Sequence, residues 1–333
     1  MRFDLVKMPL VPAFLTLAAL AAFGLGCLPA GAPVADPRGA IAPESLPLLP
    51  LGAALGRFQA LFPLGAKLLG GLLLLFTGSS LGRLSMRYNL YVTTTCLALP
   101  LYGAAMLPAL HDEAWLAAIV ASTLLLLFLR NACLGYRNGF AFDRFFRAAL
   151  FLSLLVLLCP AALPLLAALP AAIVRFRRTG RELIAALGGL LLPAATIAYL
   201  NWALGGSLVA PFAAWWQTIA VGSPAAALLA LPLGDRLVAG LFGLTAVAAF
   251  LLFRSVRYHV GTKARHIVYF AGRLFLLALL VLPMLGAGIG TLGLAAVPAA
   301  LLLPVLFLRL RRSVARLLYL FEIAAAIAAC LVR

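Results

Sequence analysis

Long apolar runs separated by short charged islands organise the chain from one end to the other. A helix rises about 1.5 Å per residue, so about 18 or more apolar residues cross the hydrocarbon core of a bilayer. We therefore predict an all-α fold, a polytopic transmembrane helix bundle of about 10–11 membrane segments that forms a single domain over residues 1–333. The apolar segments run approximately over 9–29, 60–80, 89–109, 114–129, 148–158, 161–174, 183–200, 237–253, 268–287, 289–308 and 317–332.

Two of these segments are too short to cross a membrane alone. Segments 148–158 and 161–174 meet at Cys159 and Pro160, and proline interrupts a helix because it lacks the backbone N–H. The pattern predicts a short hairpin near 148–174 that enters the membrane and returns to the same face. The basic islands on its two sides then share that face.

The composition excludes a soluble protein of this size. Hydrophobic residues make up 65% of the chain, charged residues only 11%, and the mean hydropathy is +1.13. A soluble domain has about a quarter of its residues charged, so most of this exterior must face lipid. The net charge of +17 would suggest nucleic acid in a soluble chain, but in a membrane protein it reports topology, and we predict no nucleic-acid partner.

The positions of Lys and Arg predict the orientation. With the amino terminus in the cytoplasm, 20 of the 26 Lys and Arg residues fall in cytoplasmic stretches, as the positive-inside rule requires. We therefore predict a multi-pass protein of a bacterial inner membrane. Its expected regions are a cytoplasmic stretch at 1–8, outer loops at 30–58 and 201–236, and basic cytoplasmic loops at 130–147, 175–182, 254–267 and 309–316.

The first apolar segment has two interpretations. Arg2 and Lys7 precede it and small residues follow it at 30–32, which is also the pattern of a cleaved signal peptide. Its apolar core of about 20 residues is longer than the usual 7–15 of such peptides. The length favours a retained signal anchor.

The familiar signatures of catalysis are missing from the sequence. There is no P-loop, no dinucleotide-binding glycine fingerprint, no HExxH motif and no Ser, His and Asp set. The five cysteines show no paired spacing, and the three histidines lie in predicted loops. We predict no disulfide framework, no metal site and no cofactor.

Ionisable groups inside apolar segments are costly and are therefore candidates for function. Lys67 and Arg273 lie near the predicted ends of their segments, where long side chains reach the interface. Glu322 lies about five residues into the last segment. We predict that Glu322 forms a structural ion pair with Arg273 or Arg316, with a proton-binding or cation-binding role as the alternative.

A cytoplasmic island at 136–147 interleaves aromatic residues with arginines, which is typical of an interfacial helix on anionic lipid. The expected partners are the bilayer and its anionic headgroups, and a specific phospholipid or polyprenyl-phosphate site is the alternative. The candidate contacts on this island and on the next basic loop are Arg137, Arg144, Arg147, Arg177, Arg178 and Arg181.

Three stretches carry a weak family likeness. They are Arg87-Tyr88-Asn89 to Pro100-Leu101-Tyr102, the island around Gly139, and 177–182 followed by Gly188, Gly189 and Pro193. Together they resemble uncharacterised multi-pass inner-membrane proteins of Bacteroidota, over about 60–330. This resemblance implies no known activity.

The order of segments has a looser likeness to the membrane domains of lipid-linked-sugar glycosyltransferases. Those enzymes carry a catalytic acid soon after the first span, often in an acidic pair, and many add a soluble carboxy-terminal domain. The resemblance makes Asp36 and Glu44 weak catalytic candidates. Here Pro37 and Arg38 follow Asp36, Glu44 comes eight residues later, and no soluble domain follows, so the match is incomplete.

The scarcity of polar groups decides between the functional hypotheses. We predict a non-enzymatic component of cell-envelope assembly, or a subunit of a membrane complex that requires a membrane-protein partner. One alternative is a glycosyltransferase-like enzyme that uses polyprenyl-phosphate-linked sugars. A second alternative is a secondary transporter with Glu322 as its coupling residue.

Overall fold

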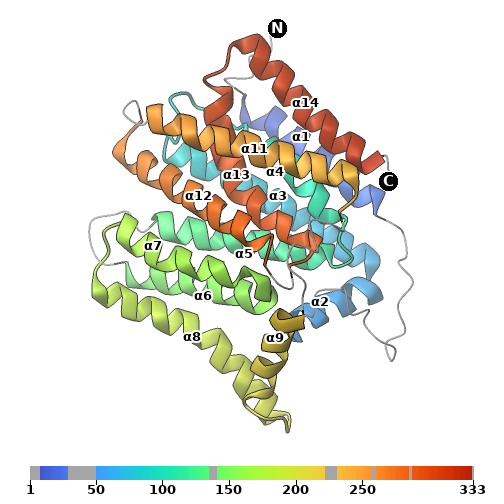
Figure 1. Cartoon of the computed structure of the whole chain (residues 1–333), viewed down its shortest axis with the longest axis vertical. Coiled ribbons are helices and arrows are strands. Elements are labelled where there is room, and N and C mark those ends of the chain that lie inside the picture. Colours follow the sequence, from blue (N-terminus) through green and yellow to red (C-terminus); the bar gives the residue numbers. More distant parts are fainter. Residues whose placement is uncertain are drawn as a thin grey trace.

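The computed structural model describes residues 8–28, 50–134, 141–221, 231–256, 260–284 and 287–331, and within these ranges it contains helices and no strand (Figure 1). The helices are α1 (Leu10–Cys27), α2 (Pro50–Leu61), α3 (Pro63–Arg87), α4 (Ala98–Leu110), α5 (Trp115–Leu134), α6 (Phe142–Leu158), α7 (Ala168–Arg175), α8 (Gly180–Ala203), α9 (Ala210–Val221), α11 (Leu233–Val256), α12 (Thr262–Val281), α13 (Leu292–Phe307) and α14 (Arg312–Leu331), with 3-10 helices η2 (Pro160–Ala167) and η4 (Ile289–Thr291).

Length and hydropathy qualify eight of the described helices as membrane spans. Shorter apolar helices occupy Ala98–Leu110 and Pro160–Arg175, and α6 adds 17 residues. The predicted all-α polytopic bundle is therefore confirmed, and each of the eleven predicted segments contains a helix. The eight spans are α1, α3, α5, α8, α11, α12, α13 with η4, and α14.

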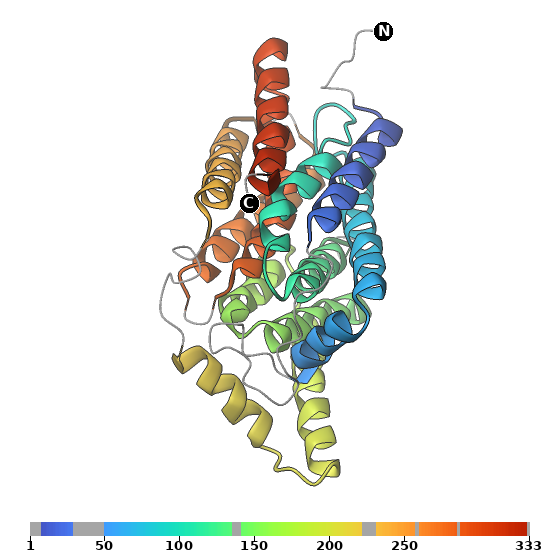
Figure 2. The ribbon, with the colours of Figure 1, turned by 90° about the vertical axis from the view of Figure 1, so that its right-hand side faces the viewer.

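Helices α4 and α13 form the centre of the bundle (Figure 2). Every residue of α13 except Ala295 is buried, and every residue of α4 except Ala105. Helix α13 packs against α4, α11, α12 and α5, while α4 also contacts α1 and α14. A helix that is apolar on all sides is one surrounded by other helices, which explains why these two sequences show no polar face.

The predicted segment 89–109 is only partly helical. Helix α4 has 13 residues, about 20 Å at 1.5 Å per residue, and the preceding residues 88–97 form turns, bends and irregular chain. The Tyr91 hydroxyl donates to the Leu301 carbonyl of α13 (2.9 Å). Two features oppose a longer helix: the β-branched run at 93–95, and Pro100, which fits best in the first turn of a helix.

Helix α6, η2 and α7 form the predicted hairpin, with its tip at Cys159 and Pro160. Cys159 has an extended backbone (φ −129°, ψ 95°), and the 3-10 helix begins at Pro160. At the open end, the backbone N–H of Ala141, just before α6, is bonded to Glu182 of α8. The two flanking basic segments therefore meet at one end of the molecule. We call this the basic end, defined by Ala141, Arg178 and Glu182.

Helices also occupy parts of the two predicted outer loops. Helix α2 begins at Pro50, within 30–58, and ends at Leu61. Gln59 of this helix donates to the Glu113 carbonyl (2.7 Å). Helix α9 lies within 201–236, where the Trp215 ring N–H donates to the Val156 carbonyl (3.2 Å). The first part of α8 packs against α6, whereas the end of α8 and α9 project from the bundle at the lower edge of Figures 1 and 2.

Candidate functional site

Glu322 lies in the middle of α14, ten residues after Arg312 and nine before Leu331. Its side chain has 0% exposure, and neither carboxylate oxygen has a hydrogen-bond partner. Buried polar groups in proteins are hydrogen-bonded with few exceptions, and each exception needs an explanation. This carboxyl group is therefore the main candidate for a functional group inside the membrane.

The buried stripe of α14 explains why Glu322 points inward. Its members recur every three or four residues, the spacing of one helix face, and they are Ala315, Tyr319, Glu322, Ala326 and Cys330. Helix α14 packs this face against α4 and α11. Thr245, in the middle of α11, faces Glu322, and its hydroxyl already donates to the Leu241 carbonyl (2.8 Å).

The predicted ion pair of Glu322 is not formed. Arg316 and Arg273 are both exposed, and no ion pair joins either of them to Glu322 within the described part of the chain. Arg316 precedes Glu322 by six residues, which turns it about 120° around a helix with 3.6 residues per turn, away from the face of Glu322. Arg273 belongs to α12, which packs against α13, η2 and α7. The prediction was wrong because nearness along the chain, for Arg316, and a shared side of the membrane, for Arg273, do not bring side chains onto facing helix surfaces.

Lys67 and Arg273 differ in their surroundings. The Lys67 ammonium, on the second turn of α3, donates to the Leu28 carbonyl just beyond the end of α1 (3.0 Å), a position where a cation also meets the negative end of the helix dipole. Arg273 follows Thr262 by 11 residues and is exposed near the middle of α12. It is farther from the helix start than the sequence pattern predicted, because α12 begins at Thr262 rather than near 268.

Three side chains form a hydrogen-bonded chain where α4, α11 and α14 meet. His111 Nδ1 lies 2.8 Å from Asp235 Oδ2, and His111 Nε2 lies 3.3 Å from Cys330 Sγ. The Asp235 side chain is 1% exposed and the His111 side chain 7%. We call this group the Cys330–His111–Asp235 triad.

Sequence reasoning missed the triad. It found no paired spacing among the cysteines and placed the histidines in predicted loops, so nothing connected either type of residue with Asp235. Asp235 lies in the first turn of α11, and its carboxylate holds the histidine. One signal was present: the predicted alternation of spans places His111, Asp235 and Cys330 on the same outer side.

A second carboxylate lies at this end of the molecule, in the turn between α4 and α5. Asp112 Oδ2 accepts the Gly290 N–H (2.7 Å), which joins the turn to η4. Burial raises the pKa of Asp112 above its ordinary value, although the N–H groups of Gly290 and Ala114 act to lower it. We call the end of the bundle that holds His111, Asp112 and Asp235 the opposite end.

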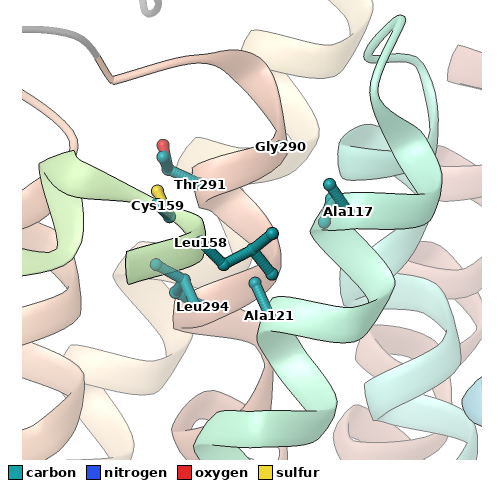
Figure 3. A pocket seen from close by; sticks show the side chains of 8 residues that line it. Ala117, Ala121, Leu158, Cys159, Gly290, Thr291 and Leu294 are labelled. Atoms are coloured by element: carbon teal, nitrogen blue, oxygen red, sulfur yellow. The ribbon is translucent and has the colours of Figure 1, made fainter. Parts of the chain in front are cut away.

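A small cavity lies nearby, between α5, the tip of the hairpin and the start of α13 (Figure 3). The volume that the centre of a water molecule can occupy is about 20 Å³. This is enough for about one water molecule. Its polar groups are the Cys159 thiol and the Thr291 hydroxyl. The rest of its lining is apolar and consists of Ala117, Ala118, Ala121, Leu158, Gly290 and Leu294. It is too small for an organic substrate.

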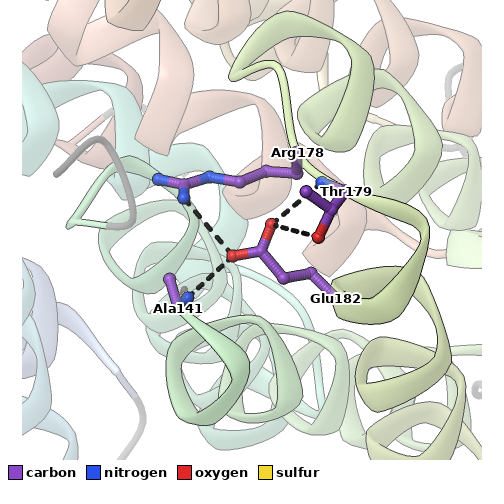
Figure 4. Close-up of polar contacts among 4 residues, drawn as sticks. All are labelled: Ala141, Arg178, Thr179 and Glu182. Atoms are coloured by element: carbon purple, nitrogen blue, oxygen red, sulfur yellow. Dashed lines mark hydrogen bonds and ion pairs between the residues drawn. The ribbon is translucent and has the colours of Figure 1, made fainter. Parts of the chain in front are cut away.

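Glu182 organises the basic end (Figure 4). Its Oε1 accepts the Ala141 N–H (2.7 Å) and the Arg178 guanidinium (3.3 Å), while Oε2 accepts the Thr179 N–H (3.0 Å). Thr179 and Glu182 form a capping box at the start of α8. The Arg178 guanidinium also lies 5.5 Å from the centre of the Phe145 ring.

The candidate lipid-contacting arginines consequently divide into groups. Arg178 is buried in the Glu182 network, so it is not placed to meet a headgroup. Arg147, Arg177 and Arg181 are exposed, and Arg147 pairs with Asp143 one turn earlier (2.9 Å). Arg144 is half-buried. Arg137 lies outside the described residues.

The weak catalytic candidates Asp36 and Glu44 also lie outside the described residues. Within the described ranges, no group of three or more His, Cys, Asp and Glu side chains is placed to hold a metal ion.

Comparison of the chain with protein-family models, with curated proteins and with solved structures found no match.

Proposed function

We propose that this multi-pass membrane protein is a secondary transporter in which Glu322 binds and releases a proton. The observation that carries the proposal is the carboxyl group at mid-span, fully buried, with both oxygens unpartnered. Ionisable residues inside membrane segments are rare, costly and associated with ion and proton pathways. Among the described residues, no counter-charge pairs with Glu322 to support a permanently ionised form.

The expected cycle follows from the cost of charge in an apolar medium. With the carboxyl group buried as it is, the neutral, protonated form is favoured, since an unpaired carboxylate there loses its hydration without compensation. Release of the proton then requires water to reach Glu322. Such access requires α14 to move relative to α4 and α11, the helices that enclose it. Proton binding is coupled to this movement of α14, because protonation of Glu322 changes the stability of the closed packing.

The interrupted segment before α4 is consistent with this proposal. Irregular backbone at membrane depth is tolerated where it is buried in protein or lines a cavity, and discontinuous helices form the binding sites of many transporters. Residues 88–97 are non-helical, and α4 packs directly against α14.

The two other hypotheses explain less of the structure. A scaffold or complex subunit, expected from the scarcity of polar groups, has no need for an unpartnered carboxyl group at mid-span. A polyprenyl-phosphate glycosyltransferase would depend on Asp36 or Glu44, and for it Asp36→Asn should lower activity about 10²-fold or more. Complementation that fails with Asp36→Asn, while the protein accumulates normally, would favour that enzyme over the transporter.

The test uses the purified chain in phospholipid vesicles and a hydrophobic carbodiimide, which modifies protonated carboxyl groups from the membrane phase. Mass spectrometry then measures the adduct at Glu322. If Glu322 exchanges protons with the bulk, labelling should fall by about tenfold per pH unit once the group is mostly ionised. Glu322→Gln should lose the adduct, while Glu113→Gln, an exposed loop variant, should keep it.

Two results would overturn the proposal. Labelling that does not change with pH would identify a permanently protonated structural residue. Absence of labelling at every pH, in protein that elutes as a folded species, would show that Glu322 does not bind a proton in the membrane.

A further inference from the structure

We propose that the Cys330–His111–Asp235 triad is a nucleophilic thiol site that accepts an acyl group from a glycerophospholipid of the surrounding leaflet. The proposal does not depend on transport by Glu322. It begins from the order of the three groups: thiol, imidazole and carboxylate, joined by hydrogen bonds of 3.3 Å and 2.8 Å.

The carboxylate determines what the imidazole does. Asp235 Oδ2 lies against His111 Nδ1, which favours the tautomer with the proton on Nδ1 and leaves Nε2 to accept a proton. Nε2 faces Cys330 Sγ, so the histidine is placed to take the thiol proton and leave a thiolate, the reactive form of cysteine. The same arrangement of nucleophile, base and orienting acid recurs in hydrolases of unrelated folds.

Helix packing holds this geometry in place. His111 directly follows α4, Asp235 lies in the first turn of α11, and Cys330 lies in the last turn of α14. The three helices contact one another in pairs. A site built on helix ends is held more precisely than one carried by a long loop. The second Asp235 oxygen, Oδ1, is buried without a hydrogen-bond partner.

The depth of Cys330 suggests the substrate. Helix α14 has 20 residues, about 30 Å, which equals the thickness of the hydrocarbon core. Cys330 is its penultimate residue, so it lies near the boundary between hydrocarbon and headgroups, where the ester carbonyls of glycerophospholipids lie.

The surface next to the triad suits a lipid. Leu233, Leu237 and Leu331 adjoin Asp235 and Cys330 in sequence and are strongly exposed, so they face acyl chains in a membrane. Arg236, between Asp235 and Leu237, is also exposed and provides a cation for a headgroup phosphate. One phospholipid can therefore place its acyl chains against these leucines and its phosphate against Arg236.

The reaction would proceed in one balanced exchange. His111 Nε2 takes the Cys330 proton, the Sγ thiolate attacks the ester carbonyl carbon, and the C–O bond to glycerol breaks. The departing glycerol oxygen receives the proton from His111, which gives a lysophospholipid and an S-acyl thioester on Cys330. No oxidant or cofactor is consumed. A second acceptor, such as water or another lipid, would then release the acyl group.

Other cysteines provide matched controls. Cys27 is exposed, whereas Cys96, Cys133 and Cys159 are buried, as Cys330 is. The Cys330 thiol lies 3.3 Å from His111 Nε2, whereas the Cys96 thiol contacts the Met86 sulfur (3.7 Å).

The experiment places the full chain in vesicles of a phospholipid whose acyl chains carry an alkyne. After incubation, a reporter is attached to the alkyne, and mass spectrometry locates acyl adducts that hydroxylamine removes. We expect a thioester on Cys330, absent from Cys330→Ser and unchanged in Cys27→Ser. His111→Gln and Asp235→Asn should lower its rate of formation by about 10²-fold or more.

A second readout separates chemistry from folding. The rate of Cys330 alkylation by iodoacetamide should fall in His111→Gln, in protein that retains its elution volume and melting temperature. Absence of the thioester in folded wild-type protein would overturn the proposal, since no acyl transfer occurs. A thioester that forms at the wild-type rate in folded His111→Gln would also overturn it, because the thiol would then react without its base.

Discussion

The carboxylate of Glu182, at the start of α8, accepts the backbone N–H of Ala141, just before α6, at 2.7 Å. This one side chain therefore caps two helices: α8 through the capping box with Thr179, and the entry to α6 through Ala141. It also pairs with Arg178 in a nearly buried position. The hydrogen bonds join the two ends of the hairpin region to each other.

Glu182→Ala should strongly destabilise the protein. The substitution leaves the buried Arg178 guanidinium without its counter-charge and two backbone N–H groups without their acceptor, and breaking a buried pair costs about 3–5 kcal/mol. The chain offers a control of the same i,i+4 spacing in Asp143→Ala. Asp143 and Arg147 are 69% and 61% exposed, and an exposed pair contributes about 0–1 kcal/mol. Thermal unfolding in detergent measures both, and equal losses for the two variants would contradict the assignment.

Gly189→Ala should disrupt the contact between α6 and α8. A Cβ at Gly189 would overlap the carbonyl group of Phe146, which is backbone and has no rotamer to adopt instead. Overpacking of this kind costs about 1–3 kcal/mol. The neighbouring Gly188→Ala places its Cβ 3.9 Å from the Phe146 ring and should leave the melting temperature unchanged or slightly raised. If both variants melt like the wild type, the helices do not approach so closely.

Asp112→Asn should flatten the pH dependence of stability. Burial raises the pKa of Asp112 in the folded protein, so the folded state holds this proton more tightly than the unfolded chain does. The resulting contribution to stability is fully present below the unfolded pKa and is lost as the pH rises through the folded one. Asparagine still accepts the Gly290 N–H but does not titrate.

Melting temperatures of wild type and Asp112→Asn, recorded in the same detergent from about pH 4 to about pH 7, test this expectation, because the Asp112 pKa is raised above its usual value of about 3.9. The wild type should lose more stability than the variant as the pH rises. Glu113→Gln, an exposed neighbour, should follow the wild-type curve. Superimposable curves for Asp112→Asn and wild type would show that Asp112 titrates as it does in the unfolded chain.

Reporter fusions after Arg147 and Arg181 should both give cytoplasmic signals, and a fusion after Glu113 should give the opposite signal. The expectation combines the positive-inside rule with the bond that places Ala141 beside Glu182. Opposite signals at the first two sites would mean that the hairpin crosses only once. Signals reversed at all three sites would keep the hairpin but invert the predicted orientation.

The sequence by itself determined the elements of this fold. A bilayer tolerates apolar helices of about 20 residues and few alternatives, so hydropathy and spacing identify the spans without knowledge of their packing. The break at Pro160 was also readable, because proline removes a backbone donor whatever surrounds it. The β-branched run at 93–95 and Pro100 also indicated where α4 begins. The apolar composition of the segment nevertheless led to the prediction of a full span.

Tertiary structure decided which faces meet, and with them the candidate sites. Apolar helices carry little polar patterning to indicate a buried side, so the distance along the chain between Glu322 and Arg316 could not show whether the two side chains meet. The triad brings together residues 111, 235 and 330, whose shared end was predictable but whose contact depends on how α4, α11 and α14 pack. The rotation of each helix about its axis determines which side chains meet. This rotation depends on shape complementarity across the whole bundle and cannot be derived from any one segment.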